Sequence, residues 1–181
     1  TPLQDNFAYL LPFIMLTFGV LFLFLQRIGH ASARYWGFGY LSAAFGFATP
    51  LVLGGLPFEV QAILSNLLFF SAFFLFGHAL LTHFEQPLYT KARLSIVIVA
   101  ALLVSFHVVV MPDLKRELVI GDLICALLLA IPVLVVRKRP ITLVDRMMVA
   151  IAALVVAETL VRIGALLVMT PNGSMIELSE F

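Results

Sequence analysis

Long apolar runs separated by short polar gaps make up most of the chain. Each run is close to the roughly 20 residues that a helix needs to cross the ~30 Å hydrocarbon layer of a bilayer. None shows the alternation of polar and apolar residues that marks a membrane β-strand. The runs cover residues 7–26, 35–54, 58–81, 94–111, 118–136 and 147–169. The pattern predicts an all-α, polytopic transmembrane helix bundle in which residues 1–181 form one membrane domain.

The composition agrees with this interpretation. Hydrophobic residues make up 62% of the chain and charged residues 12%, against about 45–50% and about 25% in soluble globular proteins. The single cysteine, Cys125, lies inside an apolar run, which argues against a disulfide framework or a thiolate metal cluster. The formal net charge of +1 gives no reason to expect nucleic acid as a partner. The lipid bilayer is the partner that the composition indicates.

The basic residues fall in alternate gaps. Only Lys115 and Arg116 lie in the gaps after the second and fourth runs. Eight lie in the gaps after the first, third and fifth runs: Arg27, Arg34, Lys91, Arg93, Arg137, Lys138, Arg139 and Arg146. Because cytoplasmic loops carry an excess of Lys and Arg, we expect the N-terminus and the end of the sixth run to lie outside. A turn is predicted at Pro171-Asn172-Gly173-Ser174, and a cytoplasmic output would need a seventh helix beyond the chain end.

Two prolines and a set of small residues indicate how the helices pack. Pro50 and Pro132 fall near the ends of the second and fifth runs, where a kink is tolerated if neighbouring helices satisfy the freed carbonyl groups. In the second run, small residues recur at a spacing that lets another helix approach closely, at Gly39/Ala43 and Ser42/Gly46. The favoured interpretation is packing inside one bundle, and a contact between two copies is the alternative.

Five polar side chains are predicted to lie at membrane depth: Asn66, His107, Asp122, Glu158 and Arg162. Ionisable groups at this depth are costly and usually face a bundle interior or a watery cavity. With the orientation above and a rise of about 1.5 Å per residue, all five fall in the outer half of the bilayer or at its centre. We therefore take these five as the candidate ligand-binding residues.

The spacing of these residues suggests partners. Glu158 and Arg162 are four residues apart, so they share a helix face and can form a structural ion pair. Alternatively, Arg162 binds a small anionic ligand from the outer side, such as a carboxylate, and Glu158 orients the guanidinium group. His107 and Asp122 could hydrogen-bond between the fourth and fifth helices, and Asn66 could bond between helices.

Other kinds of site find little support in the sequence. His78 and His107 are expected near opposite membrane faces, which suits the two axial ligands of a haem poorly. There is no glycine-rich phosphate loop, nucleophile elbow or zinc-protease helix motif. We therefore expect no catalytic residue, no metal site and no cofactor in this segment. A small transporter or permease, which would show substrate uptake, and a coloured haem-binding membrane protein remain as alternatives.

Several short motifs resemble the membrane sensor region of bacterial diguanylate cyclases, proteins with a cytoplasmic GGDEF domain. In that family a Trp-x-x-Gly start on the second helix, a Leu-Gly or Phe-Gly pair and an asparagine early in the third helix recur before a final helix that leads to the GGDEF domain. The matching stretches are Arg34-Tyr35-Trp36-Gly37-Phe38-Gly39-Tyr40-Leu41, Phe45-Gly46, Pro50, Pro57, Leu64-Ser65-Asn66-Leu67 and Glu158-Thr159-Leu160-Val161-Arg162. The resemblance covers residues 34–70 and 158–181.

This resemblance implies a homodimeric sensor in the bacterial inner membrane that controls the synthesis of cyclic di-GMP from two GTP. The chain contains no Gly-Gly-Asp/Glu-Glu-Phe sequence, so the cyclase module, with its GTP and Mg²⁺, would lie outside this segment. We expect this segment to be the sensory and regulatory domain, in which a bound ligand biases helix packing.

Overall fold

The computed structural model describes residues 2–29, 31–111 and 113–169, and it confirms the all-α prediction over this part of the chain. The turn predicted at residues 171–174, and the rest of the segment that follows the sixth run, lie outside the described residues. The helices are α1 (Pro2–Gln26), α2 (Ala33–Val52), α3 (Phe58–His83), α4 (Thr90–Val109), α5 (Leu114–Val136) and α6 (Leu143–Met169).

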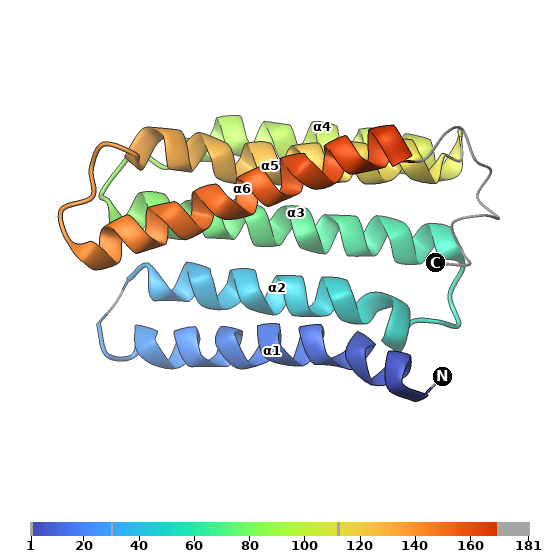
Figure 1. Ribbon diagram of the computed structural model, residues 1–181, viewed down its shortest axis with the longest axis horizontal. Helices are drawn as coiled ribbons and strands as arrows, with labels where there is room; N and C mark the ends of the chain where they lie inside the picture. The colour runs from blue at the N-terminus through green and yellow to red at the C-terminus, as the bar shows by residue number, and fades with distance from the viewer. Residues whose placement is uncertain (1, 30, 112, 170–181) are drawn as a thin grey trace.

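The helices run side by side, up and down the long axis of the molecule (Figure 1). α1 packs on α2, and α2 packs on α3. α3 also packs on α4 and α5, and α6 packs on α5. A core of fully buried side chains lies where α3, α4 and α5 meet, around Phe70, Val104 and Leu128. α3 therefore joins two parts of the bundle, the α1–α2 pair on one side and the α4–α6 helices on the other.

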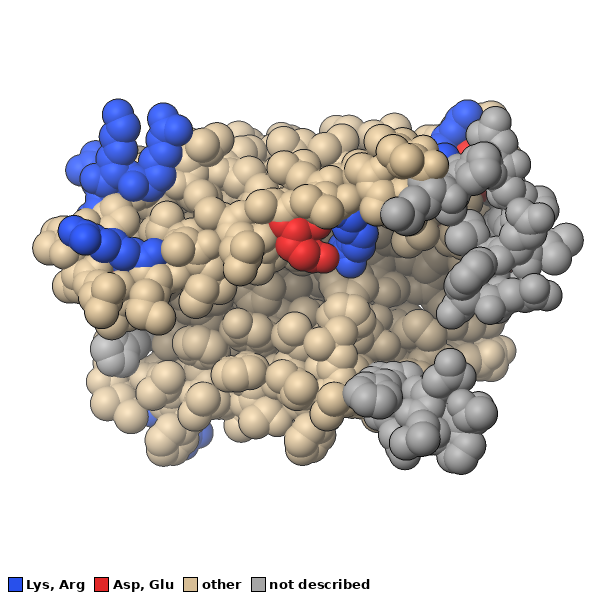
Figure 2. Space-filling view, viewed as in Figure 1, with Lys and Arg blue, Asp and Glu red and all other residues tan. Residues whose placement is uncertain are grey.

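The basic residues gather at one end of this bundle. The α1–α2, α3–α4 and α5–α6 connections all lie at the left end of Figure 1, and Figure 2 shows Lys and Arg side chains concentrated there. We call this end, which carries Arg27, Arg34, Lys91, Arg137, Lys138, Arg139 and Arg146, the basic end.

The outer surface is apolar enough for a bilayer. Within the described residues, α1, α3, α4, α5 and α6 each contain a stretch long and apolar enough to span a membrane. Large apolar side chains are exposed along them, among them Phe13, Leu102 and Val161. α2 falls short of this hydropathy because glycine, alanine and serine replace larger apolar residues, but it lies between α1 and α3. These features indicate a membrane protein.

Five helices begin earlier than the apolar runs predicted, and three of them do so by four residues. α4, α5 and α6 start at residues 90, 114 and 143, whereas the runs start at 94, 118 and 147. Side-chain caps explain two of these starts. Asp113 accepts a 3.0 Å hydrogen bond from the backbone N–H of Arg116. Thr142 and Asp145 form a reciprocal capping box, with hydrogen bonds of 3.1 and 3.0 Å between side chain and backbone. Charged residues that looked like loops therefore belong to first helical turns.

Pro50 and Pro132 have neighbours that satisfy the freed carbonyl groups, as expected for kinks near the ends of these two helices. A proline cannot donate to the carbonyl four residues before it. For Pro50 this is the carbonyl of Gly46, which accepts a 3.0 Å hydrogen bond from Ser65 Oγ of α3. For Pro132 it is the carbonyl of Leu128, which lies 3.5 Å from Nη2 of Arg93.

The small residues of α2 are used inside the bundle, as the favoured interpretation held. A Cβ atom on Gly37 would lie 2.7 Å from the side chain of Leu23 of α1. A Cβ atom on Gly39 would lie 2.6 Å from the ring of Phe76 of α3. Ser42 Oγ also donates a 2.8 Å hydrogen bond to a carbonyl of α3. The glycines therefore bring α2 close to α1 and α3.

Candidate binding site

A large cavity separates the α1–α2 pair from the α5–α6 pair. Its volume is about 1260 Å³, and residues of α1, α2, α3, α5 and α6 line it. Small-molecule pockets usually measure about 300–1,000 Å³, so this cavity has room for a long, lipid-like ligand. Figure 2 shows the surface hollowed beside the acidic and basic side chains that lie midway along this face. We call it the α2–α6 cavity.

Four of the five candidate residues line the α2–α6 cavity, together with a residue that sequence analysis missed. We call these five, Asn66, Glu117, Asp122, Glu158 and Arg162, the polar cluster. The cluster draws on the first halves of α3 and α5 and on the second half of α6. Because α6 runs antiparallel to the other two helices, these segments lie in the same half of the bundle, away from the basic end. The sequence-based expectation of a shared depth agrees with this placement.

Arg162 pairs with Asp122 rather than with Glu158. Its Nε and Nη2 donate hydrogen bonds of 2.8 and 2.5 Å to the two carboxylate oxygens of Asp122. This bidentate geometry matches a guanidinium to a carboxylate and connects α6 to α5. The predicted partner was wrong because the spacing within one helix says nothing about which residue the neighbouring helix presents. Glu158 lines the same cavity one turn away.

A second polar contact connects α3 to α5. Nδ2 of Asn66 donates a 2.6 Å hydrogen bond to Oε1 of Glu117 and a 2.9 Å bond to the carbonyl of Ala62. Glu117 is only 4% exposed. A Cβ atom on Gly121, one turn further along α5, would lie 2.8 Å from the Asn66 side-chain oxygen. Gly121 therefore makes the room that Asn66 needs, and the interhelical bond expected for Asn66 is present.

Glu117 could have been found in the sequence by its register. The buried face of α5 continues through Gly121, Cys125, Leu128 and Pro132 at helical spacing. Extending this spacing back by one turn reaches Glu117. The apolar run instead predicts a helix start at residue 118, because the charged residues 115–117 are typical of a loop.

His107 does not join the polar cluster. Its Nδ1 lies 2.9 Å from the carbonyl oxygen of Leu103 in its own helix, and its side chain does not line the α2–α6 cavity. The predicted bond from His107 to Asp122 was therefore wrong. The buried face of α4 runs through Ala100, Val104 and Val108, and His107 lies beside that face.

Arg93 is the other charged residue that sequence analysis misplaced. The sequence pattern predicts a loop position for Arg93, but it lies in the first turn of α4 and is 1% exposed. Its Nη1 donates a 3.0 Å hydrogen bond to Nδ1 of His78, and its Nη2 donates a 2.6 Å bond to the carbonyl of Phe74. The guanidinium carbon also lies 4.7 Å from the centre of the Phe74 ring. Arg93 thus connects α4 to α3.

Gly77 leaves space for the Arg93 side chain, and Pro132 provides it with an acceptor. A Cβ atom on Gly77 would overlap the Arg93 guanidinium and would lie 2.7 Å from the ring of Pro132. Pro132 in turn frees the Leu128 carbonyl that Nη2 of Arg93 approaches.

Because Arg93 is buried, seven basic residues remain exposed to the surroundings at the basic end. The asymmetry of charge between the two ends of the bundle persists.

His78 and His83, the two described histidines nearest the basic end, contact other side chains. His78 contacts Arg93 and the ring of Tyr35, and Nε2 of His83 lies 2.8 Å from Oδ1 of Asp145. Neither histidine lines the α2–α6 cavity. No group of three or more His, Cys, Asp and Glu side chains among the described residues is placed to hold a metal ion.

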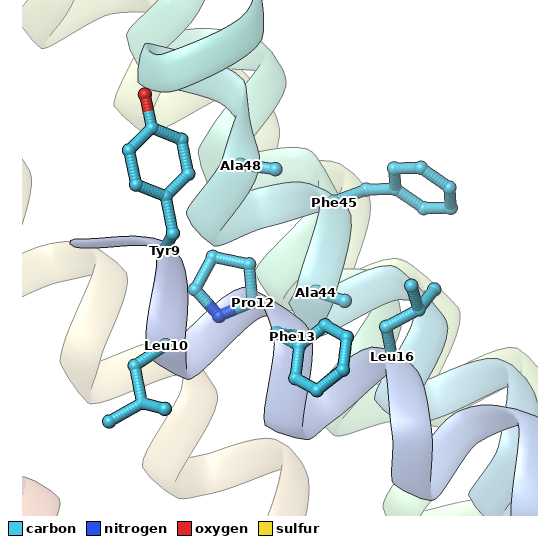
Figure 3. A pocket seen from close by; sticks show the side chains of 8 residues that line it. All are labelled: Tyr9, Leu10, Pro12, Phe13, Leu16, Ala44, Phe45 and Ala48. Carbon is cyan, nitrogen blue, oxygen red and sulfur yellow. The ribbon is translucent and has the colours of Figure 1, made fainter. Parts of the chain in front are cut away.

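A smaller hollow of about 480 Å³ lies on the outer side of the bundle between α1 and α2. Figure 3 shows Pro12 and Phe13 of α1 facing the small side chains Ala44 and Ala48 of α2, with Phe45 turned away. Its lining is almost entirely apolar, and it opens widely to the surface. None of the residues that line it is charged.

The chain matches no family model, no curated protein and no solved structure. The interpretation of the site therefore depends on its own geometry.

Proposed function

We propose that this chain is a membrane-embedded sensory domain, in which a ligand in the α2–α6 cavity sets how the α1–α2 pair packs against α5 and α6. The observation that carries the proposal is the cavity itself, with a volume of about 1260 Å³ and a polar cluster on its wall. The two helix pairs on either side of it are joined through α3. Such an arrangement lets the α1–α2 pair shift relative to α5 and α6 while α3, α4 and α5 keep their shared core.

The physical mechanism is a shift between two packings. A ligand changes their populations only if it binds one packing better than the other. A ligand that contacts both α2 and α6 does this, because the distance between those helices differs between the packings. Rigid-body movement of packed helices is a common form of such switches.

The sidedness of charge supports an orientation with the basic end in the cytoplasm. Seven basic residues lie at that end, and Lys115 and Arg116 lie at the other. If α1 and α3 each cross, as their length and hydropathy suggest, α2 between them would cross as well, and the N-terminus would lie outside in this orientation. The polar cluster then lies in the outer half of the membrane, where a ligand from the outer side reaches it.

We propose that the domain controls a cytoplasmic diguanylate cyclase module. The whole protein would lie in the bacterial inner membrane and form a homodimer. The support is the resemblance of residues 34–70 and 158–181 to the sensor regions of those enzymes. The topology is compatible, because six crossings leave the end of α6 outside and a seventh helix would return the chain to the cytoplasm.

The reading frame around residues 1–181 provides the first check. It should encode a further apolar helix and then a Gly-Gly-Asp/Glu-Glu-Phe sequence. Expression of the full coding sequence in a bacterium should raise cyclic di-GMP several-fold. A frame without that sequence, or an unchanged nucleotide level, contradicts the cyclase output.

A pair of variants then tests whether the cavity controls this output. Val155→Trp places a large ring into the α2–α6 cavity, whereas Leu154→Trp, at the neighbouring position, adds the same ring at a site that is 68% exposed and does not line the cavity. We expect Val155→Trp to change the cyclic di-GMP level at least threefold and Leu154→Trp to leave it unchanged. Equal levels in both variants and the wild type contradict the sensory role of the cavity.

A further inference from the structure

We infer that the ligand of the α2–α6 cavity is a single-chain amphipathic cation, with its charged group at the polar cluster and its apolar chain along the rest of the cavity. This inference rests on the proposed sensory function and adds the chemical class of the ligand. It is carried by the unequal charges of the cavity wall and by the division of that wall into a polar and an apolar part.

The charged side chains on the wall are mostly acidic. Glu117, Asp122 and Glu158 contribute three carboxyl groups, and Arg162 contributes one guanidinium group. Among the described residues, no lysine or histidine lines the cavity. When ionised, the wall therefore has an excess of negative charge that only a cationic ligand complements. A charge of this kind at membrane depth is costly unless a partner of opposite sign faces it.

Arg162 already forms an ion pair with a carboxylate of the protein, that of Asp122. Both of its nitrogen atoms that face α5 donate to Asp122. The anionic ligand suggested by the sequence would have to compete with this bidentate contact and would also approach Glu158 and Glu117. A cation instead meets Glu158, which is exposed on the cavity side of α6. The structure thus favours the opposite sign of ligand from the one that Arg162 alone suggested.

The rest of the wall suits an aliphatic chain. Aromatic rings line it from α2 and α3, including Trp36, Tyr40, Phe69, Phe73 and Phe76. Such rings pack against methylene groups and also attract cations at their faces. A phospholipid fits less well, because its phosphate would lie next to the carboxyl groups of the cluster. A free single-chain amine or quaternary ammonium compound carries no such phosphate.

The fluorescence of Trp36 can report ligand binding in the cavity. Trp36 is the single tryptophan of the chain and lines the cavity. The purified protein is kept in dodecyl maltoside micelles, which carry no charge. Dodecyltrimethylammonium with a bromine at the chain end is added, and the bromine quenches Trp36 fluorescence when the chain enters the cavity. The matched probe has the same brominated chain with a sulfate headgroup.

We expect the ammonium probe to quench at concentrations at least tenfold lower than the sulfate probe. Glu158→Gln should weaken the ammonium probe about tenfold, the size expected for a lost charge-assisted contact. Glu59→Gln removes an exposed acidic group of α3 that does not line the cavity and should change nothing. Arg162→Gln should tighten binding of the ammonium probe, because it frees Asp122, whereas an anion site anchored by Arg162 would lose affinity.

Equal affinities for the two probes, tighter binding of the sulfate, or an unchanged affinity in Glu158→Gln overturns the inference. Quenching by neither probe also overturns it and indicates that protein, such as another helix, fills the cavity. These results are separable from the proposed function. If the tryptophan variants at residues 154 and 155 differ in output but the ammonium probe does not bind, only the ligand class fails. If the probe binds but these variants do not differ, the sensory role fails.

Discussion

Arg162 and Asp122 form a bidentate ion pair between α6 and α5, with hydrogen bonds of 2.8 and 2.5 Å. The pair lies at membrane depth, where an ionised group that loses its partner costs roughly 3 kcal/mol. A double-mutant cycle of Asp122→Asn and Arg162→Gln should therefore show a coupling of about 1–3 kcal/mol in the free energy of unfolding. Titration with sodium dodecyl sulfate in mixed micelles measures it.

The surface pair of Arg116 and Asp113 provides the control for this cycle. Its contact of 2.9 Å lies at the end of α5, and both side chains are more than a third exposed. Exposed ion pairs contribute at most about 1 kcal/mol. The coupling for Arg116→Gln and Asp113→Asn should be clearly smaller. Additive effects of the Arg162 and Asp122 variants would show that their contact does not hold α6 on α5.

Gly77→Ala should destabilise the bundle by about 1–3 kcal/mol, because overpacking a close contact forces neighbouring groups to move. The added methyl group would overlap the guanidinium of Arg93 and lie 2.7 Å from Pro132. Gly164→Ala is the matched change in α6, where a Cβ atom meets nothing within 4 Å. That variant should be neutral or more stable by up to about 1 kcal/mol. Thermal unfolding in micelles ranks the two, and equal stability contradicts the tight packing around Arg93.

Ser65→Ala should cost about 1 kcal/mol, because it removes the donor to the Gly46 carbonyl. The variant Pro50→Ala restores a backbone N–H that can donate to the same carbonyl. We therefore expect the double variant Ser65→Ala with Pro50→Ala to recover most of the lost stability. Ser71→Ala, which removes only a bond to its own helix at Leu67, should have little effect. An equal loss in the single and double variants would contradict this role of Ser65.

The sequence predicted the parts of the fold that depend on hydropathy and chain direction. The continuous apolar runs identified six helices, and their alternation placed Asn66, Asp122, Glu158 and Arg162 in one half of the bundle. That prediction needed only antiparallel neighbours and a constant rise per residue. Ser65 and Arg93, by contrast, were not foreseen as the donors to the carbonyl groups freed by the prolines, although the need for donors was clear.

Helix rotation and helix ends explain what the sequence did not predict. Whether Arg162 meets Glu158 or Asp122 depends on how α6 is rotated against α5, and packing between the helices sets that rotation. His107 was placed at a suitable depth but lies to the side of the face that α4 buries. Hydropathy predicts loop positions for Glu117 and Arg93, because it identifies the apolar centre of a helix and misses charged first turns.

The relative movement of the two helix pairs is the most direct test of the account. Two exposed positions at the basic end can carry spin labels. One label is attached at Ala31→Cys in the α1–α2 connection, and the other at Ile141→Cys in the α5–α6 connection. The buried Cys125 is replaced by alanine. Double electron–electron resonance then gives the distance distribution between the labels in the parent protein, in Val155→Trp and in Leu154→Trp. The account predicts a shifted distribution for Val155→Trp and an unchanged one for Leu154→Trp. Identical distributions in all three proteins would contradict it.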